Sequence, residues 1–190
     1  MTGRTILIVD DEAPIREMIA VALEMAGYEC LEAGNSQEAL AVIVDRKPDL
    51  LLLDWMLPGS TGIELARRLK RDELTADIPI IMLTAKGEED NKIQGLEVGA
   101  DDYIKKPFSQ RLLSERVKAL LRRTRANAPG ADPGGDKKPI VRGELTLDPN
   151  RHACTWKGEQ VRLTVTEFLI LQALAQRPGD QPGDRRHLRL

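Results

Sequence analysis

The chain has 190 residues, of which 42% are hydrophobic and 31% are charged, and its formal net charge is -2. This composition is typical of a globular protein with one full hydrophobic core and part of a second, and it excludes a globally basic nucleic-acid-binding chain, although not a local basic patch. There is no apolar run of membrane-spanning length and no signal peptide, so we expect a cytoplasmic protein without membrane contact. Cys30 and Cys154 are isolated in the sequence and are expected to be reduced thiols.

Five short apolar runs alternate with amphipathic segments in the first two thirds of the chain. We expect strands at residues 5–9, 28–33, 50–53, 78–83 and 102–104. Helices are expected to begin at Pro14, at Ser36 as an N-cap, at Gly62, near Glu88 and after the cap Ser109. Four consecutive leucines at 50–53 are typical of a strand buried on both faces. The alternation predicts an α/β fold with a parallel sheet, right-handed crossovers and helices on both faces.

The composition changes after this region. Residues 126–139 are rich in Pro and Gly and are interpreted as a flexible linker between a first domain at 1–125 and a second region at 140–190. Alternating patterns predict antiparallel strands at 144–148, 151–156 and 160–163. Thr164 and Glu167 form a capping-box motif for a helix at 164–176, and residues 180–190 are a polar, Arg-rich tail.

Functional side chains follow four of the predicted strands. They are Asp10 and Asp11, Asp54, Thr84, and Lys106. The carboxyl ends of parallel strands meet at one edge of the sheet, where three carboxylates repel one another unless a cation lies between them. Oxygen ligands favour Mg²⁺, and an aspartate beside a lysine and a hydroxyl is suited to accept a phosphoryl group. Taken singly, each residue has a plainer interpretation, such as a helix cap or a surface charge.

Five motifs then resemble the receiver domain of two-component response regulators. They are Val9-Asp10-Asp11-Glu12, Leu53-Asp54-Trp55-Met56-Leu57-Pro58-Gly59, Leu83-Thr84-Ala85, Gly99-Ala100-Asp101-Asp102-Tyr103 and Lys106-Pro107-Phe108. The resemblance covers residues 5–123 and implies a flavodoxin-like (βα)5 fold. It also implies that a sensor histidine kinase phosphorylates Asp54. Asp11, Asp54 and the Met56 carbonyl would hold Mg²⁺, with Asp10 acting through water.

The same resemblance assigns roles on the phosphoryl side of the site. Thr84, the Ala85 backbone N–H and Lys106 would bind the phosphoryl group. Tyr103 would be a switch aromatic that turns inward with Thr84. The bond between Lys106 and Pro107 would be cis, which proline permits.

Within the second region at 140–190, residues 143–179 resemble the start of the winged-helix DNA-binding domain of the OmpR/PhoB class, with its strand platform and first helix only, whereas residues 180–190 match none of that domain. A recognition helix and wing are expected in a complete family member but match nothing in this chain. We therefore expect a truncation or altered reading frame, an exposed apolar face on the helix at 164–176, and no specific reading of DNA bases.

The family dimerises through a face made by the fourth helix, fifth strand and fifth helix. Its charged positions are matched here by Lys92, Asp101, Asp102, Arg116 and Arg123. Cross-pairs Asp102–Arg116 and Asp101–Arg123 are expected between two copies. Leu112 replaces the acidic partner of Lys92, which predicts weaker dimerisation, because single rim ion pairs contribute little.

These features predict a phosphorylation-controlled transcription regulator, and two other functions are alternatives to it. A receiver-only module would accept phosphate and dimerise without specific DNA binding. A phosphatase with an aspartate nucleophile generally carries a second Asp two residues later as general acid, but Met56 stands there, and no Walker-type loop is present. We therefore expect no enzyme activity beyond Mg²⁺-assisted phosphoryl acceptance and self-dephosphorylation.

Overall fold

The structure is a computed structural model that describes residues 3–85, 99–126 and 138–176. The helix expected near Glu88 and the dimer-face residue Lys92 lie outside the described residues.

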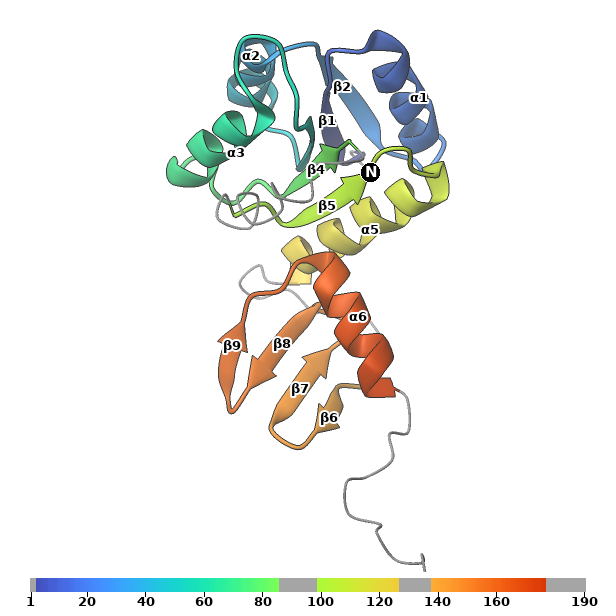
Figure 1. Cartoon of the computed structure of the whole chain (residues 1–190), viewed down its shortest axis with the longest axis vertical. Coiled ribbons are helices and arrows are strands. Elements are labelled where there is room, and N and C mark those ends of the chain that lie inside the picture. Colours follow the sequence, from blue (N-terminus) through green and yellow to red (C-terminus); the bar gives the residue numbers. More distant parts are fainter. Residues whose placement is uncertain (1–2, 86–98, 127–137, 177–190) are drawn as a thin grey trace, which may run out of the picture.

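A five-stranded parallel sheet organises the first domain (Figure 1). Its strands are β1 (Thr5–Val9), β2 (Glu29–Ala33), β3 (Leu50–Asp54), β4 (Ile80–Thr84) and β5 (Asp102–Lys105), in the order β2-β1-β3-β4-β5. All residues of β3 are buried, as the run of leucines predicted. The chain moves outward from β1 in both directions, so the carboxyl ends of β1 and β3 form the position where ligands bind in open α/β sheets. The predicted flavodoxin-like fold is confirmed for this domain.

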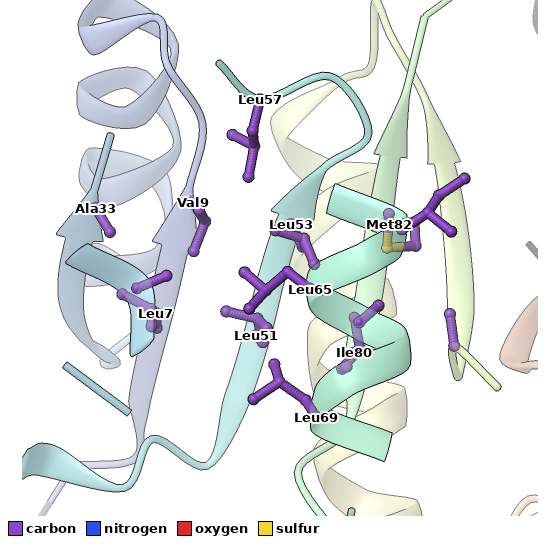
Figure 2. Close-up of a cluster of buried hydrophobic side chains, with 14 of the residues drawn as sticks. Leu7, Val9, Ala33, Leu51, Leu53, Leu57, Leu65, Leu69, Ile80 and Met82 are labelled. Carbon is purple, nitrogen blue, oxygen red and sulfur yellow. The ribbon is translucent and has the colours of Figure 1, made fainter. Parts of the chain in front are cut away.

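Helices cover both faces of this sheet. Helices α1 (Ala13–Glu24) and α5 (Gln110–Ala126) lie on one face, and α2 (Ser36–Arg46) and α3 (Gly62–Arg71) lie on the other (Figure 1). Figure 2 shows Leu65 and Leu69 of α3 packed over Leu51 and Leu53 of β3. These side chains are buried, and each such burial contributes about 1.5–3 kcal/mol to stability.

The helix caps agree with the sequence except at α2. Asn35, not Ser36, is the N-cap, because the Asn35 side chain accepts hydrogen bonds from the backbone N–H groups of Gln37 and Glu38. Ser36 lies one position inside the helix, where its hydroxyl accepts a 2.7 Å hydrogen bond from Ser60. The prediction of a Ser36 cap was therefore wrong by one residue.

The second region is a small antiparallel sheet with one helix packed on it (Figure 1). Its strands are β6 (Ile140–Arg142), β7 (Leu145–Asp148), β8 (Ala153–Trp156) and β9 (Glu159–Val161), followed by α6 (Val165–Gln176). Strand β6 was not predicted, because three residues are too few to show alternation. The Thr164–Glu167 capping box is present, with both reciprocal hydrogen bonds formed. Leu147, Cys154 and Phe168 form its buried core.

The first turn of α6 contacts the first domain at β5 and α5 (Figure 1). Val165 is fully buried in the hydrophobic cluster that α5 forms with the sheet, and its N–H donates to the Asp101 carbonyl at 3.2 Å. Further along α6, Leu169, Ile170 and Leu174 are 38%, 56% and 58% exposed, which agrees with the expected apolar surface on this helix. Within the described residues, no helix is long and apolar enough to cross a membrane.

Candidate functional site

Three aspartates meet at the carboxyl edge of the parallel sheet. Asp10 follows β1 and Asp54 ends β3, and these strands are direct neighbours, with Val9 paired to Leu53. One oxygen from each of Asp10, Asp11 and Asp54 lies within 4.8 Å of the other two. Asp10 and Asp54 are buried, whereas Asp11 is exposed. The predicted acidic cluster is therefore present, open to solvent on the Asp11 side.

Lys106 brings a positive charge into this cluster from the loop after β5. Its Nζ lies 2.7 Å from Asp10 Oδ2 and 3.1 Å from Asp54 Oδ1. The backbone N–H of Lys106 donates to the Thr84 carbonyl at 2.7 Å, which fixes the loop against the end of β4. The peptide bond between Lys106 and Pro107 is cis, as predicted.

The surroundings shift the pKa of both partners in this contact. Burial raises the pKa of Asp54 to about 6, with the Asp10 charge adding to the rise and the Lys106 charge opposing it. Burial alone would lower the pKa of Lys106, but its hydrogen bond to Asp10 and the charge of Asp54 outweigh burial and raise it. Asp54 is therefore a buried carboxylate with a raised pKa beside other charged groups, which is typical of a group that reacts or binds a cation.

Gly62 and Arg16 support the site, and the sequence did not predict this role for either of them. Gly62 begins α3, and a Cβ added there would lie 1.9 Å from the Asp54 carbonyl oxygen. Its N–H also donates to the Trp55 carbonyl at 2.9 Å, so α3 starts directly against the loop that follows Asp54. Arg16, in the first turns of α1, donates to the backbone carbonyls of Asp10 and Asp11. The Thr61–Glu64 capping box could have shown from the sequence that Gly62 begins a helix close to Asp54. No local sequence pattern indicates the role of Arg16.

Of the remaining predicted site residues, Thr84, Ala85 and Met56 lie at or just after the strand ends, and Tyr103 lies further back on β5, opposite Met82. Thr84 ends β4 and is half-buried, and Ala85 follows it and is exposed. Met56 lies two residues after Asp54, with its side chain 58% exposed. Tyr103 on β5 is half-buried against the sheet, and burial together with the charges of Asp101 and Asp102 raises its pKa to about 12. Its hydroxyl is therefore neutral.

The donor set of the acidic cluster fits Mg²⁺. All three side chains offer carboxylate oxygens, which are the hard ligands that this ion prefers, and an exposed Asp11 leaves room for the waters that Mg²⁺ keeps. Lys106 already supplies one positive charge to Asp10 and Asp54, and a cation at the cluster would offset the remaining repulsion.

The four described residues that were predicted for ionic dimer contacts, Asp101, Asp102, Arg116 and Arg123, have partners within the chain. Arg116 Nη1 lies 3.5 Å from Asp102 Oδ2, and Asp101 accepts a 2.9 Å hydrogen bond from Lys70. Arg123 Nη1 donates to the Leu163 carbonyl at 2.6 Å, just before α6. The first turn of α6 thus occupies part of the surface that was expected to face a second copy. Leu112 is exposed on α5.

The comparisons with known proteins agree with the geometry. Residues 6–118 match the response regulator receiver domain family. The chain is 72% identical over 172 residues to the phosphate regulon transcriptional regulatory protein PhoB of Pseudomonas aeruginosa, covering 90% of this chain and 72% of that protein. It is 44% identical over 176 residues to the PhoB of Escherichia coli, covering 93% of this chain and 74% of that protein.

Solved structures show the same likeness for the first domain. A putative response regulator from Chloroflexus aurantiacus is 44% identical, covers 63% of this chain and 98% of its own, and gives a TM-score of 0.60. A CheY-like receiver domain from Methanospirillum hungatei is 34% identical, covers 66% of this chain and 99% of its own, and gives a TM-score of 0.63. The chain belongs to the two-component response regulators, as a member of the OmpR/PhoB class close to PhoB.

Proposed function

We propose that a sensor histidine kinase phosphorylates this protein on Asp54 and that phosphorylation controls its action on transcription. The observation that carries the proposal is the position of Asp54, which has one carboxylate oxygen within 4.8 Å of an oxygen of Asp10 and of Asp11 and another contact at 3.1 Å to Lys106 Nζ. Identity of 72% to P. aeruginosa PhoB supports phosphate-starvation genes as targets and a PhoR-like kinase as the phosphoryl donor.

The reaction proposed is transfer of a phosphoryl group to a carboxylate. An oxygen of ionised Asp54 forms a bond to the phosphorus of a phosphohistidine, the bond from phosphorus to the histidine nitrogen breaks, and that nitrogen keeps the electron pair. Because burial raises the pKa of Asp54 to about 6, the carboxylate is still mostly ionised near neutral pH and is more basic than an exposed aspartate. The Lys106 ammonium lies where it can balance charge on the transferring oxygens.

Mg²⁺, held by Asp11, Asp54 and the Met56 carbonyl with Asp10 acting through water, would supply charge neutralisation for the phosphoryl oxygens. Thr84 and the Ala85 N–H would then bind the phosphoryl group, because Thr84 ends β4 and Ala85 follows it at the same edge as Asp54. Tyr103, on the neighbouring strand β5, would follow Thr84 inward as the conformational readout. Water would later hydrolyse the acyl phosphate, so the chain turns over its own phosphoryl group only.

The output proposed is a phosphorylation-dependent dimer that regulates transcription, with DNA as the partner of a complete OmpR/PhoB-class member; no recognition helix lies among the residues that the structure describes. The small sheet β6–β9 and α6 are proposed as the platform and first helix of a winged-helix domain. The dimer would use Asp101, Asp102, Arg116 and Arg123, together with Lys92. A gel shift with a phosphate-regulon promoter tests the DNA part, and it separates this function from that of a receiver-only module.

Acetyl phosphate labelling in the presence of Mg²⁺ tests the central step. Intact mass spectrometry should show one added phosphoryl group on the wild-type chain and none on Asp54→Asn. Asp45→Asn, which changes an exposed carboxylate on α2, is the matched control and should label like the wild type. Persistent labelling of Asp54→Asn would move the acceptor to another residue and refute the proposal.

A further inference from the structure

Arg16 holds the loop that carries two of the three aspartates. Its Nη1 donates to the Asp10 carbonyl at 2.7 Å and to the Asp11 carbonyl at 3.2 Å, and its Nε donates to Glu32 Oε2 at 3.1 Å. The side chain is only 17% exposed. One guanidinium therefore joins the loop between β1 and α1 to strand β2.

The anchor on β2 is itself part of a connected set of contacts. The Asp10 N–H donates to the Ala33 carbonyl at 3.2 Å, one residue after Glu32. The next residue, Gly34, donates its N–H to Glu38 Oε2 at 2.7 Å, and the Arg16 charge helps to hold the pKa of Glu38 low, after the hydrogen bonds from Gly34 and Asn35. The segment to which Arg16 binds is thus itself held in place by hydrogen bonds.

We propose that Arg16 is a positioning residue for the Mg²⁺ site, acting through the main chain of Asp10 and Asp11. The inference rests on the proposed function, because it concerns the same metal site. A planar guanidinium can bridge two carbonyls and a carboxylate at fixed angles, which an ammonium cannot do as rigidly. Partners that orient metal ligands from behind typically change metal affinity by about 10-fold to 100-fold when they are removed.

Simple electrostatics predicts the opposite sign. Arg16 is a cation near an acidic cluster, so removing its charge alone would reduce repulsion and strengthen the binding of Mg²⁺. Positioning predicts weaker binding, because the loop carrying Asp10 and Asp11 loses its restraint. The sign of the change in affinity therefore separates the two effects without any assumption about their size.

The experiment is a Mg²⁺ titration of the full chain followed by the fluorescence of Trp55. Trp55 directly follows Asp54 and is 4% exposed, whereas Trp156 is 49% exposed, so all proteins carry Trp156→Phe to remove the second signal. Arg16→Met should weaken Mg²⁺ binding about 10-fold. Arg16→Lys should recover part of the loss, since it restores one donor and the charge but not the bridging geometry.

Arg46→Met is the matched control. Arg46 makes a similar pair with the same strand, since its Nη2 lies 3.0 Å from Glu29 Oε1, but no carbonyl of the aspartate loop is among its partners. It should leave Mg²⁺ binding unchanged. Unfolding measured without metal checks that each variant is folded. If Arg16→Met does not fold, Glu32→Gln replaces it, because this substitution weakens only the contact between Arg16 and β2. Glu32→Gln should also weaken Mg²⁺ binding.

Two results would overturn the inference. Unchanged or tighter Mg²⁺ binding by folded Arg16→Met, with a parent protein that binds normally, would refute the positioning role and leave the proposed function intact. A parent protein without a saturable Mg²⁺ response, by fluorescence or by thermal shift, would overturn the metal site of the proposed function and this inference with it.

Discussion

The hydroxyl of Thr166 donates a 2.6 Å hydrogen bond to Asp102 Oδ1, joining the first turn of α6 to β5 across 64 residues of chain. The Thr166 N–H donates to the same oxygen at 3.2 Å. Asp102 is fully buried, and burial raises its pKa, with the Thr166 hydrogen bond and the Arg116 charge opposing the rise. Its other oxygen and Arg116 Nη1 make no hydrogen bond within the described residues. Thr166 is therefore a principal hydrogen-bond donor to this carboxylate.

Thr166→Val should loosen the contact between α6 and the first domain. The substitution keeps the shape and removes the hydroxyl, which leaves a buried carboxylate short of a donor at a cost of about 1–3 kcal/mol. Amide hydrogen exchange should become faster at positions 165 and 166, whose N–H groups donate to Asp101 and Asp102 in the wild type. If the proposed dimer face is correct, sedimentation should also show a larger dimer fraction, because Asp102 becomes available to a second copy.

Thr155→Val, on β8 of the small sheet, is the control for Thr166→Val and should change neither measurement. Unaltered exchange at Val165 in Thr166→Val would mean that apolar packing of Val165, rather than the hydrogen bond, holds the two regions together.

The raised pKa of Asp54 predicts how stability depends on pH. The pKa rises from 3.8 to about 6 on folding, so the folded chain keeps a proton that the unfolded chain releases between these values. The stabilisation from this bound proton is therefore fully present below pH 3.8, falls as the pH rises from 3.8 to about 6, and is lost above that range. The free energy of unfolding decreases by about 2–3 kcal/mol across the range. Without Mg²⁺, Asp54→Asn should be more stable than wild type near neutral pH.

Urea unfolding across this pH range is the measurement for Asp54. The advantage of Asp54→Asn should shrink towards the acid end, where wild-type Asp54 is protonated in both states. Asp45→Asn, at an exposed position, serves as the comparison and should show no such trend. An advantage that does not vary with pH would show that ionisation of Asp54 is not its cause.

Lys106→Ala should reveal how much the ammonium compensates the carboxylates. Its removal leaves Asp10, which is fully buried, and Asp54 without their cationic partner, and we expect a loss of roughly 3 kcal/mol in the absence of metal. Mg²⁺ should stabilise this variant more than the wild type, because the ion then supplies charge that Lys106 supplied before. Thermal unfolding with and without Mg²⁺ measures both effects, and Lys118→Ala on the exposed side of α5 controls for loss of a lysine. Equal Mg²⁺ stabilisation of both proteins would contradict the expectation.

Gly62→Ala should disturb the start of α3. The new Cβ would lie 1.9 Å from the Asp54 carbonyl oxygen, which belongs to the backbone and cannot move aside as a side chain would. Overpacking of a core typically costs about 1–3 kcal/mol, and we expect the upper end here. Gly3→Ala is the control, because its Cβ would make an ordinary contact at 3.6 Å with the Gly27 carbonyl. Equal denaturation midpoints for the two variants would contradict this account.

The sequence was most informative where one local pattern determines the structure. The leucines at 50–53 predicted a strand buried on both faces, and β3 is one. Side chains just after parallel strands were predicted to meet, and Lys106 reaches Asp10 across 96 residues. The receiver fold and its acidic cluster could therefore be predicted before any coordinates.

The features that could not be predicted depend on tertiary contacts. Asn35 and Ser36 are both good N-caps, and only the path of the loop decides between them. Arg16 carries no local mark of its role, because its three acceptors come from two separate segments. The bond between Thr166 and Asp102 depends on how the two regions pack, which no periodicity records.

Lys106 and the three aspartates together set the net charge of the site. Three carboxylates and one ammonium leave two units of negative charge in excess, which one divalent cation cancels. Converting Asp54 to an acyl phosphate would then return the edge of the sheet to net negative charge. If Asp54 is phosphorylated as proposed, hydrogen-bond donors at the ends of β4 and β5 are the groups placed to offset this surplus.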